Sequence, residues 1–465
     1  MDLHEKIWQS QSELIARLQG CIQIPSVYAD DGSGHPYGAQ VHRCLTYMLE
    51  LARELGFPAQ EMDGQVGWCE YGQGKEMVAV LCHLDVVPEG DGWTVPPYEG
   101  RVVDGKLYGR GAIDDKGPAV AALFALKALK DAGVPLKRRI RILFGLNEET
   151  GSADMKYYLS HGGEVPVMGF TPDGEYPVIN GEKGLVTESY ARSWDQSGPV
   201  RIAQLWGGTA HNIVPAQAWA QLACSPDLAG EIAALPADKI TCTPVQGGLR
   251  VEAMGVSAHG GSPQEGENAI GRLLQFLARL PLEGDAAQTV RFLAEKLGME
   301  CDGASLGIAV SDQLSGPLTM NLGILRGDEH GLEVRLNYRY PVTCTFEDCG
   351  PAVETAFAGA GFARTYQQHK PRIYMPPDTP LVEKLLKVYR ACTGLSAQPK
   401  CIGGGTYAKM MPNILAFGPV FPGDEVREHK PDEFIEISRL MENTEIIAAA
   451  MYELAHSDSE RMESR

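Results

Sequence analysis

The sequence predicts an α/β fold with helices on both faces of a mixed sheet, interrupted by an inserted α+β region. Strand and helix patterns alternate between residues 77 and 173, as in a sheet that is covered by helices. Polar motifs follow the predicted strands, at the edge where open α/β sheets bind ligands. After Gly184 strands predominate, and a helical pattern returns at Pro380. We therefore expect one discontinuous domain, residues 1–183 and 377–465, and an inserted domain, residues 184–376.

Each element of the first domain follows from the spacing of apolar residues. The pattern predicts helices over residues 2–20, 42–55, 117–132 and 153–160, and strands over residues 77–82, 139–146 and 167–170. Glycines at positions 20, 56 and 133 end the first three of these helices, as is common at helix C-termini. A loop rich in Pro, Gly and Trp (88–97) is long enough to form one wall of a site.

The inserted region and the C-terminal region follow the same reasoning. The inserted region is predicted to contain strands over residues 186–193, 200–206, 214–224, 249–257 and 332–340, and helices near residues 266–281 and 286–298. The C-terminal region is predicted to contain a helix over 380–393, a strand over 413–418 and a helix over 435–455. Residues 457–465 are polar, and we expect them to fray.

Composition excludes several classes of protein. A chain of 465 residues is expected to form two or three domains. The net charge of −19 disfavours nucleic acid and anionic membranes as partners. The chain contains neither an apolar run of membrane-spanning length nor a signal-peptide pattern, so we expect a cytoplasmic protein. Eleven scattered cysteines without a Cys-x-x-Cys pair indicate reduced thiols.

Two motifs near the first predicted strand contain metal-ligand types. His83 and Asp85 are two residues apart at the strand end, so Asp85 could accept the second ring N–H of a metal-binding His83. A chance dipolar pair is the alternative. Asp114 and Asp115 precede a buried helix, where one carboxylate could bridge two cations. Helix capping is the alternative explanation.

Glu148 and Glu149 follow an apolar strand, where adjacent carboxylates repel each other and are costly to desolvate. Metal ions would compensate this charge, and one acid could bind metal while its neighbour takes a proton from water. A solvated loop pair is the alternative. Taken singly, Asp173 is an ordinary turn acid and His429 an ordinary surface histidine.

The order of these motifs resembles the M20 family of dinuclear zinc peptidases, and within it the PepV-type dipeptidases, which include carnosinase-like and Xaa-His dipeptidases. The resemblance implies a phosphorylase/hydrolase-like zinc-peptidase catalytic domain, with the inserted region as a lid large enough for two subdomains. It also implies two Zn²⁺ ions per chain, which Mn²⁺ or Co²⁺ could replace. The implied ligands are His83 and Asp173 for one ion and Glu149 and His429 for the other, with Asp114 bridging both.

The same resemblance implies roles in hydrolysing dipeptides, with β-Ala dipeptides as candidate substrates. Glu148 would be the general base, and Asp85 would orient His83. His259 would polarise the scissile carbonyl, assisted by Asn212. The remaining implied residues would hold the substrate carboxylate: Arg339, Gly404, Gly405 and Thr406. His211 matches no family position.

Two of these residues also have simpler interpretations: His259 could be a histidine in a turn, and Arg339 could be a charged residue on the surface of a sheet. For the whole chain, one alternative is an N-acyl-amino-acid deacylase of the same family. A metal- or peptide-binding protein without catalysis is the other. We expect a monomer that supplies His259 in cis, binds a small peptide substrate, and binds neither nucleic acid nor membrane.

Overall fold

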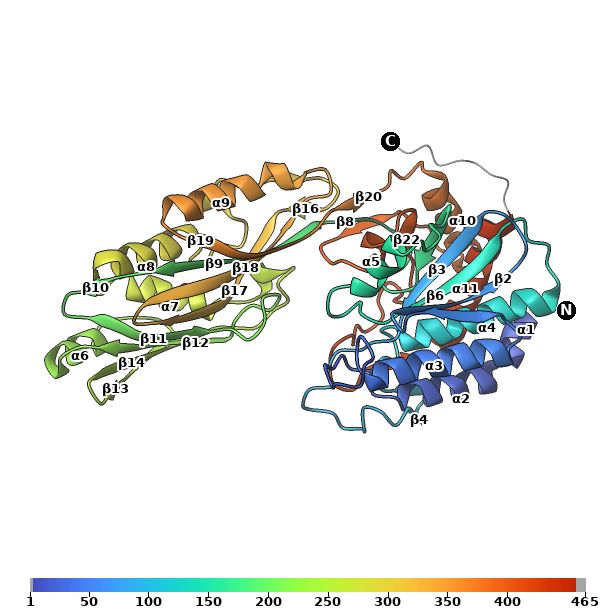
Figure 1. Ribbon diagram of the computed structural model, residues 1–465, viewed down its shortest axis with the longest axis horizontal. Helices are drawn as coiled ribbons and strands as arrows, with labels where there is room; N and C mark the ends of the chain where they lie inside the picture. The colour runs from blue at the N-terminus through green and yellow to red at the C-terminus, as the bar shows by residue number, and fades with distance from the viewer. Residues whose placement is uncertain (1–2, 457–465) are drawn as a thin grey trace. The chain divides into compact units, whose positions relative to one another are not determined.

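The computed structural model describes residues 3–456, so the predictions for residue 2 and for residues 457–465 lie outside the described range. The chain forms two compact units (Figure 1). Unit 1 comprises Met1–Asn180, Met375–Lys400 and Gly405–Arg465, and unit 2 comprises Gly181–Tyr374 and Cys401–Gly404. The predicted boundaries after residues 183 and 376, and two subdomains within the lid, stay predictions.

The sheet of unit 1 is mixed and has a parallel centre. Its central strands are parallel and lie in the order β6 (Arg139–Gly145), β3 (Met77–His83), β7 (Met168–Thr171) and β22 (Ile414–Ala416). Antiparallel strands β2 (Val66–Tyr71) and β1 (Ala59–Met62) extend the edge beside β6. Beyond β22 the sheet continues through β8 (Ile179–Glu182), which pairs with β20 (Ile373–Tyr374) and β21 (Lys400–Ile402). Every residue of β3 is buried, which explains why this strand is apolar along its whole length.

Helices cover both faces of this sheet, as the sequence predicted. α4 (Lys116–Ala132) and α11 (Ile437–His456) contact each other and also β3 and β6. α3 (Ala39–Glu54) packs on β1 and β2, while α10 (Pro380–Thr393) packs on α11. On the opposite face α5 (Ala153–Ser160) packs through Tyr158 against the ring of Trp68. A separate small sheet contains β4 (Arg101–Val103), β5 (Lys106–Tyr108) and β23 (Phe434–Glu436).

The prediction of one N-terminal helix over residues 2–20 is wrong. The segment forms two helices, α1 (Leu3–Gln9) and α2 (Gln11–Ile22), that are separated at Ser10. The backbone N–H and the hydroxyl of Ser10 both donate to the carbonyl of Ile7, at 3.0 and 2.7 Å. This local bonding by serine competes with a continuous helix.

Unit 2 is built on one antiparallel sheet of eight strands. Their order is β13 (Ile240–Val245), β14 (Gly248–Met254), β12 (Gln217–Ala223), β11 (Arg201–Gly207), β17 (Thr319–Asp328), β18 (Gly331–Tyr340), β9 (Gly184–Ser193) and β19 (Ala363–Lys370). Its other described strands and α-helices are β10 (Gln196–Ser197), β15 (Ser311–Asp312), β16 (Gly316–Pro317), α6 (Pro226–Ala233), α7 (Ala269–Leu277), α8 (Gly284–Lys296) and α9 (Gly350–Gly359). Apolar residues of these helices and strands form a second core.

The structure also describes the state of the cysteines and the lengths of the apolar helices. All eleven cysteines are free thiols. Among residues 3–456, no helix is both long and apolar enough to cross a membrane.

Candidate metal centre

The parallel strands of unit 1 bring the candidate ligands together at one edge of the sheet. His83 is the last residue of β3, and Asp173 lies two residues after the end of β7. Glu149 lies in the loop that follows β6, and His429 in the loop that follows β22. Asp114 directly precedes Asp115, the N-cap residue of α4. The carboxyl ends of parallel strands meet at a common edge, so residues up to 346 positions apart become neighbours.

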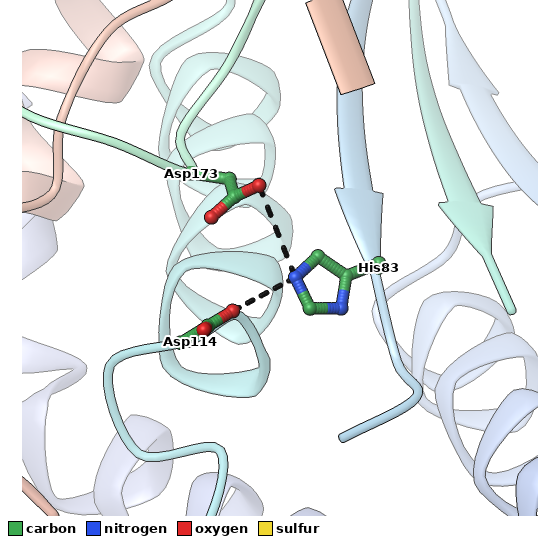
Figure 2. A group of neighbouring side chains, drawn as sticks. All are labelled: His83, Asp114 and Asp173. Carbon is green, nitrogen blue, oxygen red and sulfur yellow. Dashed lines mark ion pairs between the residues drawn. The ribbon is translucent and has the colours of Figure 1, made fainter. Parts of the chain in front are cut away.

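The first potential ligand group consists of His83, Asp114 and Asp173. Figure 2 shows both carboxylates directed toward the same imidazole nitrogen. His83 Nε2 lies 2.9 Å from Asp114 Oδ1 and 3.9 Å from Asp173 Oδ2. His83 is only 1% exposed, so its ring is held in the interior with one nitrogen turned to the two acids.

The second potential ligand group consists of Asp114, Glu149 and His429. His429 Nε2 lies 2.9 Å from Asp114 Oδ2 and 3.1 Å from Glu149 Oε1. Asp114 therefore directs one carboxylate oxygen to each histidine and belongs to both groups. A carboxylate with this orientation can bridge two cations.

The pKa values reflect crowded carboxylates with too little positive charge around them. Burial raises the pKa of Asp173 well above its usual range, and the charge of Asp114 adds to the effect. Burial and Asp114 likewise raise the pKa of Glu149. Burial lowers the pKa of His429, but the carboxylates of Asp114 and Glu149 outweigh it and raise the pKa to about 11. Divalent cations would compensate this negative charge, and carboxylate and imidazole donors suit Zn²⁺ and similar ions.

Asp85 contacts both His83 and the loop that carries Glu148 and Glu149, here called the glutamate loop. The backbone N–H groups of Glu148 and Glu149 donate to Asp85 Oδ1 and Oδ2, each at 3.1 Å. His83 Nδ1 lies 2.9 Å from the backbone carbonyl oxygen of Asp85 and 3.6 Å from its Oδ1. The nearest partner of Nδ1 is thus the backbone carbonyl of Asp85, whereas we expected its carboxylate. The Asp85 carboxylate is instead committed to the loop of the proposed base.

The two adjacent acids at the start of α4 have different partners. The peptide bond between Asp114 and Asp115 is cis. Asp115 is fully buried and accepts the backbone N–H of His83 at 3.0 Å. Asp114 faces the two imidazoles, so one acid lies among potential ligands and the other supports the strand end that carries His83.

Sequence reasoning missed two residues that support the glutamate loop. Asp154 is buried in α5, and its Oδ2 accepts the backbone N–H groups of Leu146 and Asn147 at 2.6 and 3.1 Å. The hydroxyl of Tyr407 also donates to Asp154, and the Tyr407 ring meets the His83 ring edge-on, with centroids 6.0 Å apart. The only available signal was an acid in the first turn of a helix, which is common without function.

Within unit 2, two of the predicted substrate residues contact each other. Arg339 is 3% exposed, and its Nη1 donates to the carbonyl of Gly403 at 2.7 Å. Its Nη2 lies 3.4 Å from His259 Nε2. Burial lowers the pKa of Arg339 to about 10. A buried guanidinium beside a histidine can bind an anionic group.

The other predicted substrate residues have local structural partners. The backbone carbonyl of Asn212, in unit 2, accepts the N–H of Gly260 at 2.7 Å, which joins the loops of Asn212 and His259. Thr406, in unit 1, accepts the N–H of Ala408 at 3.1 Å and caps the short 3-10 helix Tyr407–Lys409. Gly404 and Gly405 lie in the segment directly before Thr406.

Residues 79–453 match the model of peptidase family M20/M25/M40. The chain belongs to this family. The M20 resemblance indicated by the motifs is therefore confirmed, and the chain is a peptide-bond hydrolase. "Putative dipeptidase YtjP" of Bacillus subtilis (strain 168) is 36% identical over 98% of this chain and 100% of its own length.

Solved structures of two dipeptidases have the same fold. Human carnosine dipeptidase 1 aligns with a TM-score of 0.55 at 17% identity, covering 98% of this chain and 99% of the other. The di-peptidase Dug1p from Saccharomyces cerevisiae aligns with a TM-score of 0.59 at 14% identity, covering 98% of each chain. This agreement confirms the α/β fold class with an inserted α+β lid.

Proposed function

We propose that this M20 enzyme is a broad-specificity dipeptidase that uses two divalent metal ions, with Glu148 as the general base. The observation that carries the proposal is the pair of ligand groups that share Asp114. The donor set fits two Zn²⁺ ions, with Mn²⁺ or Co²⁺ as alternatives. The name of the Bacillus subtilis relative supports dipeptides as the substrate class.

Five residues would hold the ions: His83 and Asp173 one of them, Glu149 and His429 the other, and Asp114 both. Bound metal ions would supply Lewis acidity that lowers the pKa of a water molecule and polarises the scissile carbonyl. Glu148 would take the proton of the attacking water and deliver it to the leaving amine, as a general base and then a general acid. The proposal is supported by the two hydrogen bonds from the Glu148–Glu149 backbone to Asp85, which fix the base next to a ligand.

The lid residues would recognise the rest of the substrate. We propose that Arg339, assisted by the Gly404–Thr406 segment, binds the free carboxylate, since a guanidinium suits that geometry. His259, with Asn212, would polarise the carbonyl, and a monomer would supply it in cis. The hydrogen bond between the Asn212 and His259 loops supports their acting together. Dipeptides of β-Ala are included among the proposed substrates.

Steady-state assays on a substrate panel test this proposal. The panel contains α-dipeptides, β-Ala dipeptides, and acetyl- and succinyl-amino acids. We expect cleavage of dipeptides with a free amine. Activity on the acyl compounds alone would contradict the dipeptidase assignment and favour the deacylase.

Glu148→Ala tests the base. We expect kcat to fall by about 10²–10⁴-fold, the usual contribution of a positioned proton-transfer group. Metal content, measured by elemental analysis, should stay at the wild-type value because Glu148 is in neither ligand group. Glu231→Ala, at an exposed position of α6, is the matched control. Retained hydrolysis in the Glu148 variant would remove Glu148 from this role.

A further inference from the structure

Glu433 is a fully buried acid that belongs to neither ligand group. Its Oε2 accepts Arg110 Nη1 at 2.6 Å. Its Oε1 accepts the backbone N–H groups of Gly111, Ile113 and Asp114, at 3.0, 3.0 and 3.3 Å. One carboxylate thus receives four donors from the segment that ends in the shared ligand.

These contacts are specific to the loop conformation. A buried carboxylate is costly unless it is paired and hydrogen-bonded. Arg110 is itself only 1% exposed, so the ion pair is shielded from solvent. Three backbone donors converge on one oxygen, and a shift of the loop at Asp114 would break at least one of these bonds. Glu433 therefore restrains the backbone from which the Asp114 side chain projects.

The segment that carries Glu433 also carries His429, four residues earlier. The backbone carbonyl of Glu433 accepts the N–H of Gly109 at 2.9 Å. Asp432 accepts the backbone N–H and the hydroxyl of Thr94, at 2.8 and 2.9 Å. The chain three and four residues after His429 is thus hydrogen-bonded to Thr94 and Gly109, which precede Asp114.

We propose that Glu433 is a positioning residue that sets the separation of Asp114 and His429, and thereby the affinity for the metal ion of the second group. The inference rests on the proposed two-metal function. Partners that orient metal ligands typically contribute about 10–100-fold to metal affinity. Removing the restraint by Glu433 should lower the binding affinity for one of the two ions by that factor, chiefly for the ion held by His429.

Zn²⁺ titration of the chelator-stripped full chain, with a competing indicator, tests the inference. Glu433→Gln keeps the shape of the side chain but removes its charge. We expect one Zn²⁺ to bind within about threefold of the wild-type affinity. The affinity for the other should fall by about 10–100-fold. Glu436→Gln, three residues later with 47% side-chain exposure, is the matched control and should bind both ions normally.

A His429→Ala background distinguishes positioning from general destabilisation. If both residues act on one ion, the double variant should bind that ion no more weakly than His429→Ala alone. The absorption spectrum of the Co²⁺-loaded protein should change in Glu433→Gln and stay unchanged in Glu436→Gln. If Glu433→Gln does not fold, Arg110→Lys keeps the positive charge while removing the guanidinium geometry, and a smaller weakening is expected.

The outcomes separate the two proposals. If the wild type binds two ions and Glu433→Gln binds both with unchanged affinity, the inference about Glu433 is overturned while the proposed function stands. If the wild type binds fewer than two ions, the two-metal proposal fails and the inference fails with it. Additive losses in the double variant would assign Glu433 to overall stability and overturn its positioning role.

Discussion

Replacing Asp85 by asparagine should uncouple the glutamate loop from the strand that carries His83. Asp85 is fully buried, and its two oxygens accept the N–H groups of Glu148 and Glu149. Asparagine offers one oxygen and one NH₂, so one of the two backbone donors must lose its acceptor and face another donor. A buried N–H left without a partner costs about 1–3 kcal/mol.

We expect Asp85→Asn to lower the free energy of unfolding by that amount. The Asp85→Ala variant removes both acceptors, so it should lose about 2–6 kcal/mol by the same reasoning. The expected loss in kcat/KM for asparagine is about 10–100-fold, because the loop carries both the proposed base and a proposed ligand. The contact of His83 Nδ1 with the backbone carbonyl of residue 85 is available in both variants. The loss in kcat/KM therefore measures the effect of the glutamate loop and not that of the His83 ring.

Urea unfolding followed by circular dichroism measures the stability, and steady-state dipeptide hydrolysis measures the activity. Asp104→Asn, at an exposed turn where residue 104 has a positive φ of 50°, is the control. Asparagine tolerates that conformation, so the control should match the wild type. An Asp85→Asn enzyme with kcat/KM within twofold of the wild type would refute the reasoning, since the loop would then hold its position without the carboxylate.

Three further predictions concern the metal ions, the lid arginine and the tyrosine behind the site. Treatment with a chelator should abolish hydrolysis, and adding Zn²⁺, Mn²⁺ or Co²⁺ should restore it. Activity that survives complete metal removal, checked by elemental analysis, would contradict a metal-dependent mechanism. Arg339→Lys should raise KM for dipeptides by about tenfold or more, because lysine lacks the planar fork. Arg291→Lys, at an exposed position of α8, is the control, and an unchanged KM in Arg339→Lys would exclude Arg339 from carboxylate binding. Tyr407→Phe should lower the free energy of unfolding by about 1–2 kcal/mol and reduce kcat, because the Asp154 carboxylate loses one donor. Unchanged values in both measurements would show that this hydrogen bond does not support the glutamate loop.

The sequence predicted the fold class because the parallel strands are apolar throughout and the helices between them are amphipathic or buried. β3 and α4 were predicted within one residue of their observed bounds. Strands without that signal were missed. β19 (Ala363–Lys370) is polar and mostly exposed along its length, and β17 (Thr319–Asp328) contains two glycines and a register shift. Their place in the sheet is decided by pairing with distant strands, which a local pattern does not reveal.

The same distinction applies to the site. The candidate ligands His83, Asp114, Glu149, Asp173 and His429 could be named from residue type and motif order, and the structure brings these five together. Their roles as ligands stay predictions, as do the roles of Glu148 and His259. The backbone partners of the supporting acids could not be predicted, because a local pattern does not show which N–H groups a buried carboxylate accepts. Glu433, for example, binds N–H groups about 320 positions earlier.

These supporting acids explain how carboxylates can be crowded at one sheet edge in a stable fold. Three of the segments that carry candidate ligands are held by carboxylates from other segments: Asp115 holds the end of β3, Asp85 and Asp154 hold the glutamate loop, and Glu433 holds the loop of Asp114. Backbone N–H groups are fixed partial positive charges, and they interact favourably with the carboxylates of the supporting acids without competing for the two imidazoles. Ligand acids and supporting acids are chemically identical, so residue type alone cannot separate Asp114 from Asp115. What separates them is the partner: Asp115 faces a backbone donor, whereas Asp114 faces two histidines and has an oxygen for each.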